Sequence, residues 1–303
     1  MVGRRCNRAL QQPTAPPTWF PGSVTDPERE HDVRLPSHQV RVLEWGPPEG
    51  PLVLALHGFP DTALTWRRVA PLLADAGWRV AAPYLRGYAP SGIPADGDYS
   101  VRALAADAVG LHELLNGDER TVLVGHDWGA ITTNAVASDP TSPYAKHVAL
   151  SVPPFSRMNP TRRTLGPWAG ALVRQPLRSW YIAYNQVPGL AEPSFDQLAA
   201  RLWRSWSPGY DATEDLARLR ESVPDHEHAR AVVSYYRALL GPGVTPALAE
   251  PVRPLLLLHG TDDRCLDPRF ARLAGATTIG GAGHFVQLEQ PQRVAASILS
   301  FLA

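Results

Sequence analysis

Hydrophobic and polar positions along the chain change their period several times, and each period predicts a type of element. Apolar and polar residues alternate from Asp32 to Trp45, which predicts a two-stranded hairpin with Pro36-Ser37 near its turn. Unbroken apolar runs predict strands buried on both faces at 51–56, 78–83, 121–124, 147–152 and 255–258, and a shorter strand is expected at 276–279. Helical spacing recurs at 64–76, 101–115, 131–138, 268–273 and 290–302. This alternation predicts an α/β fold with a mostly parallel, doubly wound sheet.

The alternation stops between Pro153 and about Ala249. This stretch contains tryptophans, tyrosines and many prolines, but no clear strand. It is predicted to be a helical insertion in the sheet domain.

Composition narrows the possible partners. The 303 residues can hold one large α/β domain with an insertion, or two small domains. Lys+Arg and Asp+Glu both number 29 and no basic run stands out, so nucleic acid is not expected as a partner.

Cys6 and Cys265 form no disulfide framework, which fits a reducing cytoplasm. Residues 1–25 lack the apolar core of a signal peptide and are predicted to be a flexible extension, and no run approaches the roughly 20 apolar residues of a membrane span.

The stretch from Thr121 to Ala130 carries the first sign of chemistry. A predicted strand runs into Gly125-His126-Asp127-Trp128-Gly129 ahead of a predicted helix, an order typical of a nucleophile elbow. Glycine on both sides relieves crowding around a strained central residue. A carboxylate that attacks a saturated carbon forms an ester that water can cleave, whereas a Ser hydroxyl would form a stable ether. The motif therefore predicts covalent catalysis at an sp3 carbon, by ring opening or halide loss; the alternative is an aspartate that only caps the following helix.

Further candidate groups lie in loops that follow predicted strands. Ligands bind beyond the carboxyl ends of the strands in such a sheet. The loops in question contain His57 to Pro60, Asp127, the acidic residues after Gly260, and His284. His284 can take a proton from water if a carboxylate orients its ring, although it could also be a residue that merely begins a helix. Asp262 and Asp263 compete for the carboxylate role, with Asp267 a third candidate, and the residues alone do not decide between them.

Three motifs resemble those of epoxide hydrolases with the α/β-hydrolase fold, and the likeness runs from about Asp32 to the end of the chain. The motifs are His57-Gly58-Phe59-Pro60, Arg86-Gly87-Tyr88 with Ser91, and Gly125-His126-Asp127-Trp128-Gly129. The resemblance implies an α/β-hydrolase core at 26–153 and 250–303, with a helical cap at 154–249 inserted after the strand that ends near Val152. It implies Asp127 as the nucleophile, Asp263 as the acid and His284 as the base. The backbone N–H groups of Phe59 and Trp128 are then the expected oxyanion hole.

The resemblance also implies two cap tyrosines that hold and protonate the epoxide oxygen. The first commonly precedes a Gln-x-Pro-Gly turn, and the turn at 186–189 points to Tyr181. The second usually precedes an arginine, which points to Tyr236, with Tyr235 as the alternative. A phenol with a pKa of about 10 can protonate the strongly basic alkoxide that ring opening leaves. The competing interpretation is that Tyr181 and Tyr236 are amphipathic core residues.

Other side chains complete the expected site. Those predicted to bind substrate are Phe59, Trp128, Trp180 and Ile182, while Tyr184 is expected to be a packing neighbour. No cofactor or metal is expected, because His226 and His228 have no third ligand nearby and fit a solvated loop better than a metal pair.

The predicted activity is therefore conversion of an apolar epoxide and water to a vicinal diol by a cytoplasmic enzyme, for detoxification or for biosynthesis. One alternative is a haloalkane dehalogenase, which shares the nucleophile and base. Dehalogenases often have a halide-binding Asn at the position of Phe59, so that residue favours the epoxide. A second alternative is a non-catalytic ligand-binding protein on the same fold, which would need none of Asp127, Asp263 and His284.

Overall fold

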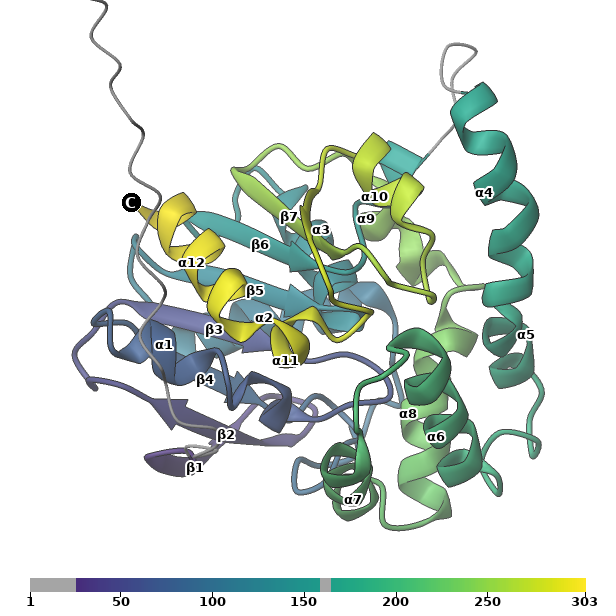
Figure 1. Ribbon diagram of the computed structural model, residues 1–303. Coiled ribbons are helices and arrows are strands. Elements are labelled where there is room, and N and C mark those ends of the chain that lie inside the picture. The colour runs from purple at the N-terminus through teal and green to yellow at the C-terminus, as the bar shows by residue number, and fades with distance from the viewer. Residues whose placement is uncertain (1–25, 159–164) are drawn as a thin grey trace, which may run out of the picture.

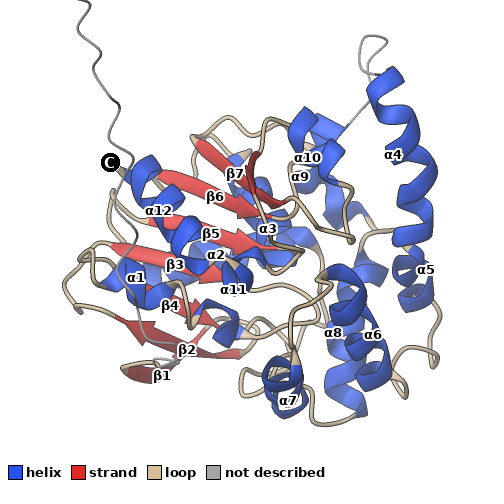
Figure 2. Ribbon diagram, viewed as in Figure 1, coloured by secondary structure: helices blue, strands red, loops and turns tan. Residues whose placement is uncertain are grey.

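The computed structural model describes residues 26–158 and 165–303, so the extension predicted at 1–25 lies outside the described residues. An eight-stranded sheet with helices on both faces forms the main body (Figure 1, Figure 2). Its strands are β1 (Arg29–Arg34), β2 (Gln39–Trp45), β3 (Leu52–Leu56), β4 (Arg79–Pro83), β5 (Val122–His126), β6 (Lys146–Leu150), β7 (Leu255–Gly260) and β8 (Thr277–Ile279).

The strands lie in the order β1-β2-β4-β3-β5-β6-β7-β8. β1 pairs antiparallel with β2, and β2 with β4, whereas the pairs from β4 to β8 are parallel. Every residue of β3 and β5 is buried, because helices cover both faces of the sheet there. The predicted hairpin and mostly parallel sheet are confirmed.

Helices of the main body cover the sheet in two layers. They are α1 (Ala70–Ala74), α2 (Val101–Leu114), α3 (Trp128–Ala137), α10 (Pro268–Leu273), α11 (Val286–Glu289) and α12 (Pro291–Leu302). α1 and α12 pack together on one face, and α2 and α3 pack together on the other (Figure 1). No helix among the described residues is long and apolar enough to cross a membrane.

The helix predicted at 64–76 is wrong in its extent. The chain forms a short 3-10 helix, η1 (Ala63–Trp66), and then the separate helix α1. The Thr62 hydroxyl accepts a hydrogen bond from the backbone N–H of Leu64 and starts η1. Pro71 lies in the first turn of α1, where its missing N–H is tolerated, and it therefore favours a new helix start.

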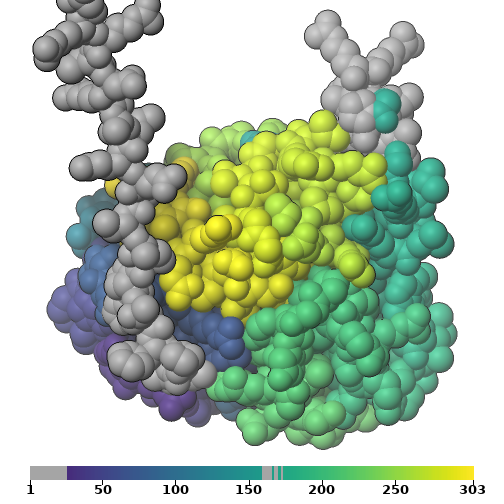
Figure 3. Space-filling view, viewed as in Figure 1, coloured from purple at the N-terminus to yellow at the C-terminus, as the bar shows by residue number. Residues whose placement is uncertain are grey.

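A helical segment is inserted between β6 and β7. Its described elements are η2 (Phe155–Met158), α4 (Leu165–Arg178), α5 (Trp180–Gln186), α6 (Phe195–Trp206), α7 (Thr213–Ser222), α8 (His226–Ala238), η3 (Pro242–Val244) and α9 (Thr245–Leu248). α5, α6 and α8 lie beyond the carboxyl ends of the parallel strands (Figure 1). In the space-filling view, teal and green residues of this insertion form a lobe against the yellow C-terminal part of the main body (Figure 3).

Buried polar contacts attach the insertion to the main body. Trp203 of α6 donates its indole N–H to the backbone oxygen of Pro60 at 2.7 Å. Arg67, which follows η1, pairs with Asp215 of α7 at 2.6 Å, and the two side chains are 0% and 2% exposed. Tyr210 donates a hydrogen bond to the other oxygen of Asp215 at 2.9 Å. Hydrogen bonds and an ion pair therefore fix the orientation of the insertion on the main body.

We predict that Asp215→Ala destabilises the protein strongly, because the buried Arg67 guanidinium loses its buried partner and keeps only the longer contact with the half-exposed Glu214 at 3.4 Å. Breaking a buried ion pair in this way typically costs about 3–5 kcal/mol. The matched control is Asp118→Ala, which removes an exposed pair with Arg120 at 2.6 Å and should leave the melting temperature nearly unchanged. Thermal unfolding of both variants measures the difference, and equal shifts would contradict a structural role for the buried pair.

Candidate active site

The turn after β5 has a backbone that only glycine neighbours permit. Asp127 has φ 51° and ψ −111°, an uncommon conformation for a residue with a side chain. A Cβ atom on Gly125 would lie 2.1 Å from the backbone oxygen of Gly129, and one on Gly129 would lie 2.4 Å from that of Leu56. The Gly-x-Asp-x-Gly spacing therefore follows from close backbone contact within the turn and with β3.

Asp127 does not cap the helix that follows it. It precedes α3 but makes no side-chain capping hydrogen bond. Its Oδ1 accepts a hydrogen bond from the backbone N–H of Phe59 at 2.8 Å, and its Oδ2 lies 3.5 Å from Nε2 of His284. Burial raises the pKa of the Asp127 carboxyl, but the contact with His284 outweighs burial and holds this pKa below its usual value. Asp127 is thus ionised at neutral pH.

His284 lies between two carboxylates. Its Nδ1 donates a hydrogen bond to Oδ2 of Asp263 at 2.9 Å. Burial lowers the pKa of His284, but the charges of Asp263 and Asp127 outweigh burial and raise this pKa to about 10. The ring is therefore protonated while both carboxylates are charged.

The geometry distinguishes between the three candidate acids. Oδ1 of Asp263 accepts hydrogen bonds from the backbone N–H groups of Cys265 at 2.6 Å and Leu266 at 3.1 Å, leaving Oδ2 for His284. Asp262 is exposed, and Asp267 binds Arg269 through two side-chain hydrogen bonds. Asp263 is the carboxylate that the fold brings to the histidine.

The backbone of His284 is also fixed. Its carbonyl oxygen accepts hydrogen bonds from Ser151 Oγ at 2.6 Å and from His126 Nε2 at 3.0 Å. Its N–H donates to Oγ of Ser207, in the inserted segment, at 2.9 Å. The ring position therefore depends on both the main body and the insertion.

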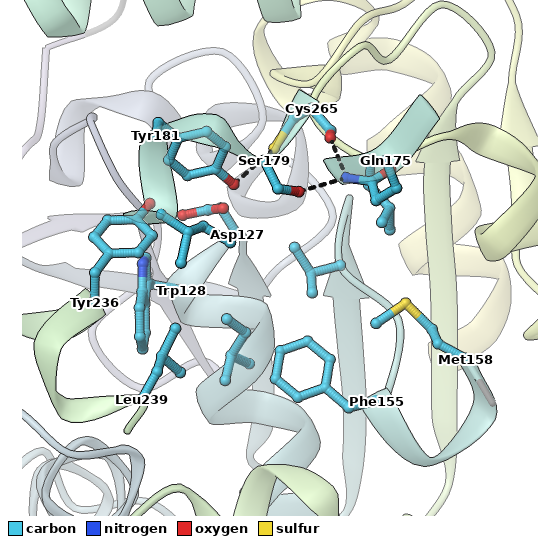
Figure 4. Close-up of a pocket in the computed structure, with 14 residues that line it drawn as sticks. Asp127, Trp128, Phe155, Met158, Gln175, Ser179, Tyr181, Tyr236, Leu239 and Cys265 are labelled. Atoms are coloured by element: carbon cyan, nitrogen blue, oxygen red, sulfur yellow. Dashed lines mark hydrogen bonds between the residues drawn. The ribbon is translucent and has the colours of Figure 1, made fainter. Parts of the chain in front are cut away.

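The two predicted tyrosines approach Asp127 from different helices of the insertion (Figure 4). Tyr181 of α5 and Tyr236 of α8 have ring centroids 5.6 Å apart, and both are buried. Burial raises the pKa of each hydroxyl well above its usual value, so both remain protonated donors. The Tyr235 hydroxyl instead donates to the backbone oxygen of Arg86 at 2.8 Å. Tyr236, and not Tyr235, lines the same cavity as Asp127.

The tyrosine hydroxyls differ in their contacts. Oη of Tyr181 lies 3.4 Å from Sγ of Cys265. The buried hydroxyl of Tyr236 makes no well-formed hydrogen bond within the described part of the chain, although the Trp128 indole faces it and opposes the effect of burial on its pKa. Tyr184 bonds to Ser194 at 2.7 Å, away from Asp127.

These groups line a cavity of about 210 Å³. Its wall is largely apolar, and the residues are Asp127, Trp128, Ile131, Val152, Phe155, Met158, Gln175, Ser179, Tyr181, Ile182, Tyr236, Leu239, Cys265 and Leu266 (Figure 4). Trp128 and Ile182 are predicted substrate-binding residues found in this wall. Such a cavity suits an apolar ligand with one polar group near Asp127.

Two predicted substrate-binding side chains, those of Phe59 and Trp180, are not in the wall of this cavity. Trp180 precedes Tyr181 on α5 and points to another side of the helix, where Arg201 lies 4.4 Å above its ring. The Phe59 ring packs edge-on against Tyr236 with centroids 4.9 Å apart, behind the cavity wall. Phe59 contacts Asp127 through its backbone N–H only.

Among the described residues, no group of three or more His, Cys, Asp and Glu side chains is arranged so that it could hold a metal ion. His228 instead contacts Asp225, the N-cap of α8, at 2.9 Å.

Sequence comparison places this arrangement in a family. A model of the alpha/beta hydrolase fold matches residues 51–291. The chain belongs to the α/β-hydrolase fold family. Among its relatives in this family, the AB hydrolase superfamily protein YfhM of Bacillus subtilis is 30% identical over 276 residues, covering 87% of this chain and 94% of the relative. Epoxide hydrolase A of Mycobacterium tuberculosis is 32% identical over 310 residues, with the same two coverages of 87% and 94%.

A solved structure in the family agrees with the fold. Epoxide Hydrolase A from Mycobacterium thermoresistibile superposes with a TM-score of 0.71 at 29% identity, covering 90% of this chain and 98% of that chain. The resemblance to epoxide hydrolases of the α/β-hydrolase fold is therefore confirmed.

Some site residues of this α/β-hydrolase could not be found from sequence. Cys265 contacts Tyr181 because the loop after Asp263 lies next to α5. Ser151 and Ser207 contact His284 from positions far apart in the chain. Only His126 had a sequence signal, because it lies inside the elbow motif.

We predict that Gly129→Ala lowers the free energy of unfolding by about 1–3 kcal/mol, the usual effect of overpacking. The added Cβ would meet backbone of β3, which cannot move aside as a flexible side chain can. The matched control is Gly166→Ala in α4, where no atom lies within 4 Å of the new Cβ, and the change should be neutral or stabilising by about 0.4–1 kcal/mol. Chemical denaturation compares the two, and a Gly129 variant as stable as the control would disprove the steric requirement.

Proposed function

We propose that this protein is an epoxide hydrolase that converts an apolar epoxide to a vicinal diol through an ester on Asp127. One observation carries the proposal: an ionised carboxylate and two protonated, buried tyrosine hydroxyls converge on one apolar cavity. A nucleophile opposite paired donors is the arrangement that ring opening needs, because the carbon is attacked while negative charge develops on oxygen.

In the first step, Oδ2 of Asp127 attacks an epoxide carbon, and the bond between that carbon and the ring oxygen breaks. Tyr181 and Tyr236 donate hydrogen bonds to the leaving oxygen, and one of them gives it a proton. The protonated His284 then returns a proton to that tyrosinate through solvent, so His284 enters the second step neutral. Oδ1 becomes the carbonyl oxygen of the ester and keeps the 2.8 Å hydrogen bond from the N–H of Phe59. The two carboxylate oxygens therefore have separate roles.

In the second step, water attacks the ester carbonyl and loses a proton to His284, which Asp263 orients. The N–H groups of Phe59 and Trp128 stabilise the oxyanion on Oδ1. Collapse of the intermediate breaks the bond between the acyl carbon and Oδ2, and the departing oxygen takes the proton that His284 holds, which releases the diol. The remaining proton of the attacking water passes to His284, so Asp127 is again a carboxylate and His284 is again protonated. No metal or cofactor is required for these steps.

The alternative activities fit the site less well. A departing halide takes no proton, so a dehalogenase has no use for the buried Tyr236 hydroxyl, even though the Trp128 indole could bind a halide. A receptor for apolar ligands has no use for a carboxylate in a strained elbow beside a charged His284.

We further propose residues 154–249 as a cap domain on a core of residues 26–153 and 250–303, since this segment supplies Tyr181, Tyr236 and the hydroxyl of Ser207. We also propose a cytoplasmic location, because the two cysteines form no disulfide framework. The substrates are a small epoxide and water.

We predict that His284→Gln stops the reaction at the ester, because alkylation of Asp127 needs no base whereas hydrolysis does. After mixing with styrene oxide and rapid quenching, mass spectrometry should find the epoxide mass added to the peptide that contains Asp127. Asp127→Asn should remove both adduct and turnover. The matched control is His112→Gln, which alters a histidine of α2 and should turn over normally. Unmodified protein in the His284 variant, despite bound substrate, would remove His284 from this role.

We predict that Tyr181→Phe and Tyr236→Phe each slow alkylation of Asp127 by about 10²–10³, the usual effect of losing one donor to developing negative charge. The double variant should be close to inactive on epoxides. The matched control is Tyr235→Phe, which removes a neighbouring buried hydroxyl bonded only to backbone and should alkylate at nearly the wild-type rate. The rate of alkylation of Asp127 is measured before steady state in all four variants.

Two outcomes would change the assignment. Undiminished ring opening in the double variant would refute the role of both tyrosines. Halide release from chloroalkanes that is faster than diol formation, in the wild-type protein, would favour the dehalogenase.

A further inference from the structure

A second cleft is separate from the cavity at Asp127. It has a volume of about 330 Å³ and lies between α4 of the insertion and the loop and helix that follow β7. Its lining residues are Arg174, Arg178, Thr261, Asp262, Asp263, Arg264, Asp267, Pro268, Arg269 and Arg272. Five of these ten are arginines from two separate segments of the chain. α4 and α10 lie next to each other in Figure 1.

The positive charge of this arginine cleft is only partly balanced. Asp267 is 4% exposed and is already bound by Arg269 through contacts of 2.9 and 2.7 Å. Asp263 is paired through its Oδ2 with the protonated His284, which balances its charge inside the protein. Asp262 is the remaining carboxylate of the lining.

Three of the guanidinium groups have no acidic partner. Within the described residues, Arg174, Arg264 and Arg272 make no ion pair, and all three are exposed. Arg178 donates to the backbone oxygen of Asp263 at 3.3 Å and is 3.9 Å from the carboxylate of Asp267. Cations gathered in one concave site repel each other and attract an anion.

We propose that the arginine cleft binds the dianionic phosphate group of a small soluble molecule and bridges α4 to the α10 region. Guanidinium groups present paired N–H donors that match phosphate oxygens. At roughly 30 Å³ for each water molecule in the liquid, the volume of about 330 Å³ holds a phosphate group together with part of the molecule that carries it. Arg174 from one side and Arg264 and Arg272 from the other are its ligands.

This anion is not a part of the epoxide substrate. Gln175 of α4 separates the arginine cleft from the substrate cavity, and its side chain is bonded on both ends. Its Nε2 donates to Ser179 Oγ at 2.9 Å and to the backbone oxygen of Cys265 at 2.8 Å, while its Oε1 accepts from the N–H of Asp267 at 3.0 Å. The wall between the two spaces is therefore closed by hydrogen bonds, and the inference does not rest on the proposed reaction.

Binding would place an anion between arginine side chains of two parts of the chain, and like charges on these side chains repel each other. α4 belongs to the insertion, whereas Arg264 and Arg272 belong to the main body. A dianion between them replaces repulsion by attraction and stabilises the folded state through linkage, because the unfolded chain has no such site. The expected signature is thermal stabilisation that depends on phosphate itself and not on ionic strength.

The experiment measures the melting temperature of the full chain in sodium phosphate and in sodium chloride of equal ionic strength. Tens of millimolar phosphate should raise it by about 2–5 °C above chloride, and the Arg264→Ala, Arg272→Ala double variant should lose this difference. The matched control is Arg102→Ala, which removes an exposed arginine at the start of α2. This variant should keep the difference in melting temperature between phosphate and chloride. These arginines are exposed, so both variants are expected to fold.

Several results would overturn the inference. A phosphate effect equal in the double variant and the wild type would mean general ion binding, and no effect above chloride would mean no site. Sedimentation with phosphatidic acid vesicles distinguishes the source of the phosphate: vesicle binding without a response to free phosphate would make the site a lipid contact and contradict a soluble ligand. Loss of epoxide hydrolysis in the catalytic variants has no bearing on any of these measurements.

Discussion

Three charged side chains share one buried space, and the surrounding structure is arranged to make this possible. Asp127, Asp263 and His284 are 4%, 1% and 0% exposed. A buried charge without partners costs several kcal/mol, so each must be neutralised and hydrogen-bonded. Phe59 supplies a backbone N–H to Asp127, the loop after Asp263 supplies two to that carboxylate, and the imidazolium lies between the two remaining oxygens. Four loops of the sheet must therefore meet at one point.

The inserted helices are part of this arrangement and not a separate lid. Ser207 accepts a hydrogen bond from the backbone of His284 and donates one to Glu289 at 2.6 Å, so the insertion helps to position the histidine as well as the tyrosines. The stacked rings of Trp203 and Phe285, with centroids 3.4 Å apart, fix α6 beside the same residue. A shift of the insertion would move both the proposed proton donors and the base.

The sequence predicts those features that depend on local chain geometry. The apolar runs predict the buried strands, and the elbow motif predicts a strained Asp127 because its glycines are required by contacts within a few residues. The helix at 64–76 was wrong because capping by Thr62 and the proline of α1 outweighed apolar spacing. Ser151, Ser207 and Cys265 carry no motif, and their roles arise only when the chain folds. Trp180 lies outside the cavity wall, since adjacency to Tyr181 on a helix does not place a side chain on the same face.

Charge in the buried space changes during the proposed reaction, and this change explains how a protonated histidine can serve as a base. Burial lowers the pKa of His284, yet Asp263 and Asp127 together raise it to about 10 in the free protein, so the ring cannot accept a proton at neutral pH. Formation of the ester removes the charge of Asp127 and with it one cause of the raised pKa. The pKa of His284 must then fall, so the imidazolium can give its proton to the tyrosinate that ring opening leaves, and Nε2 is then free to take a proton from water. Asp263 keeps its charge throughout and stabilises the imidazolium that results, which is why the two carboxylates cannot exchange roles.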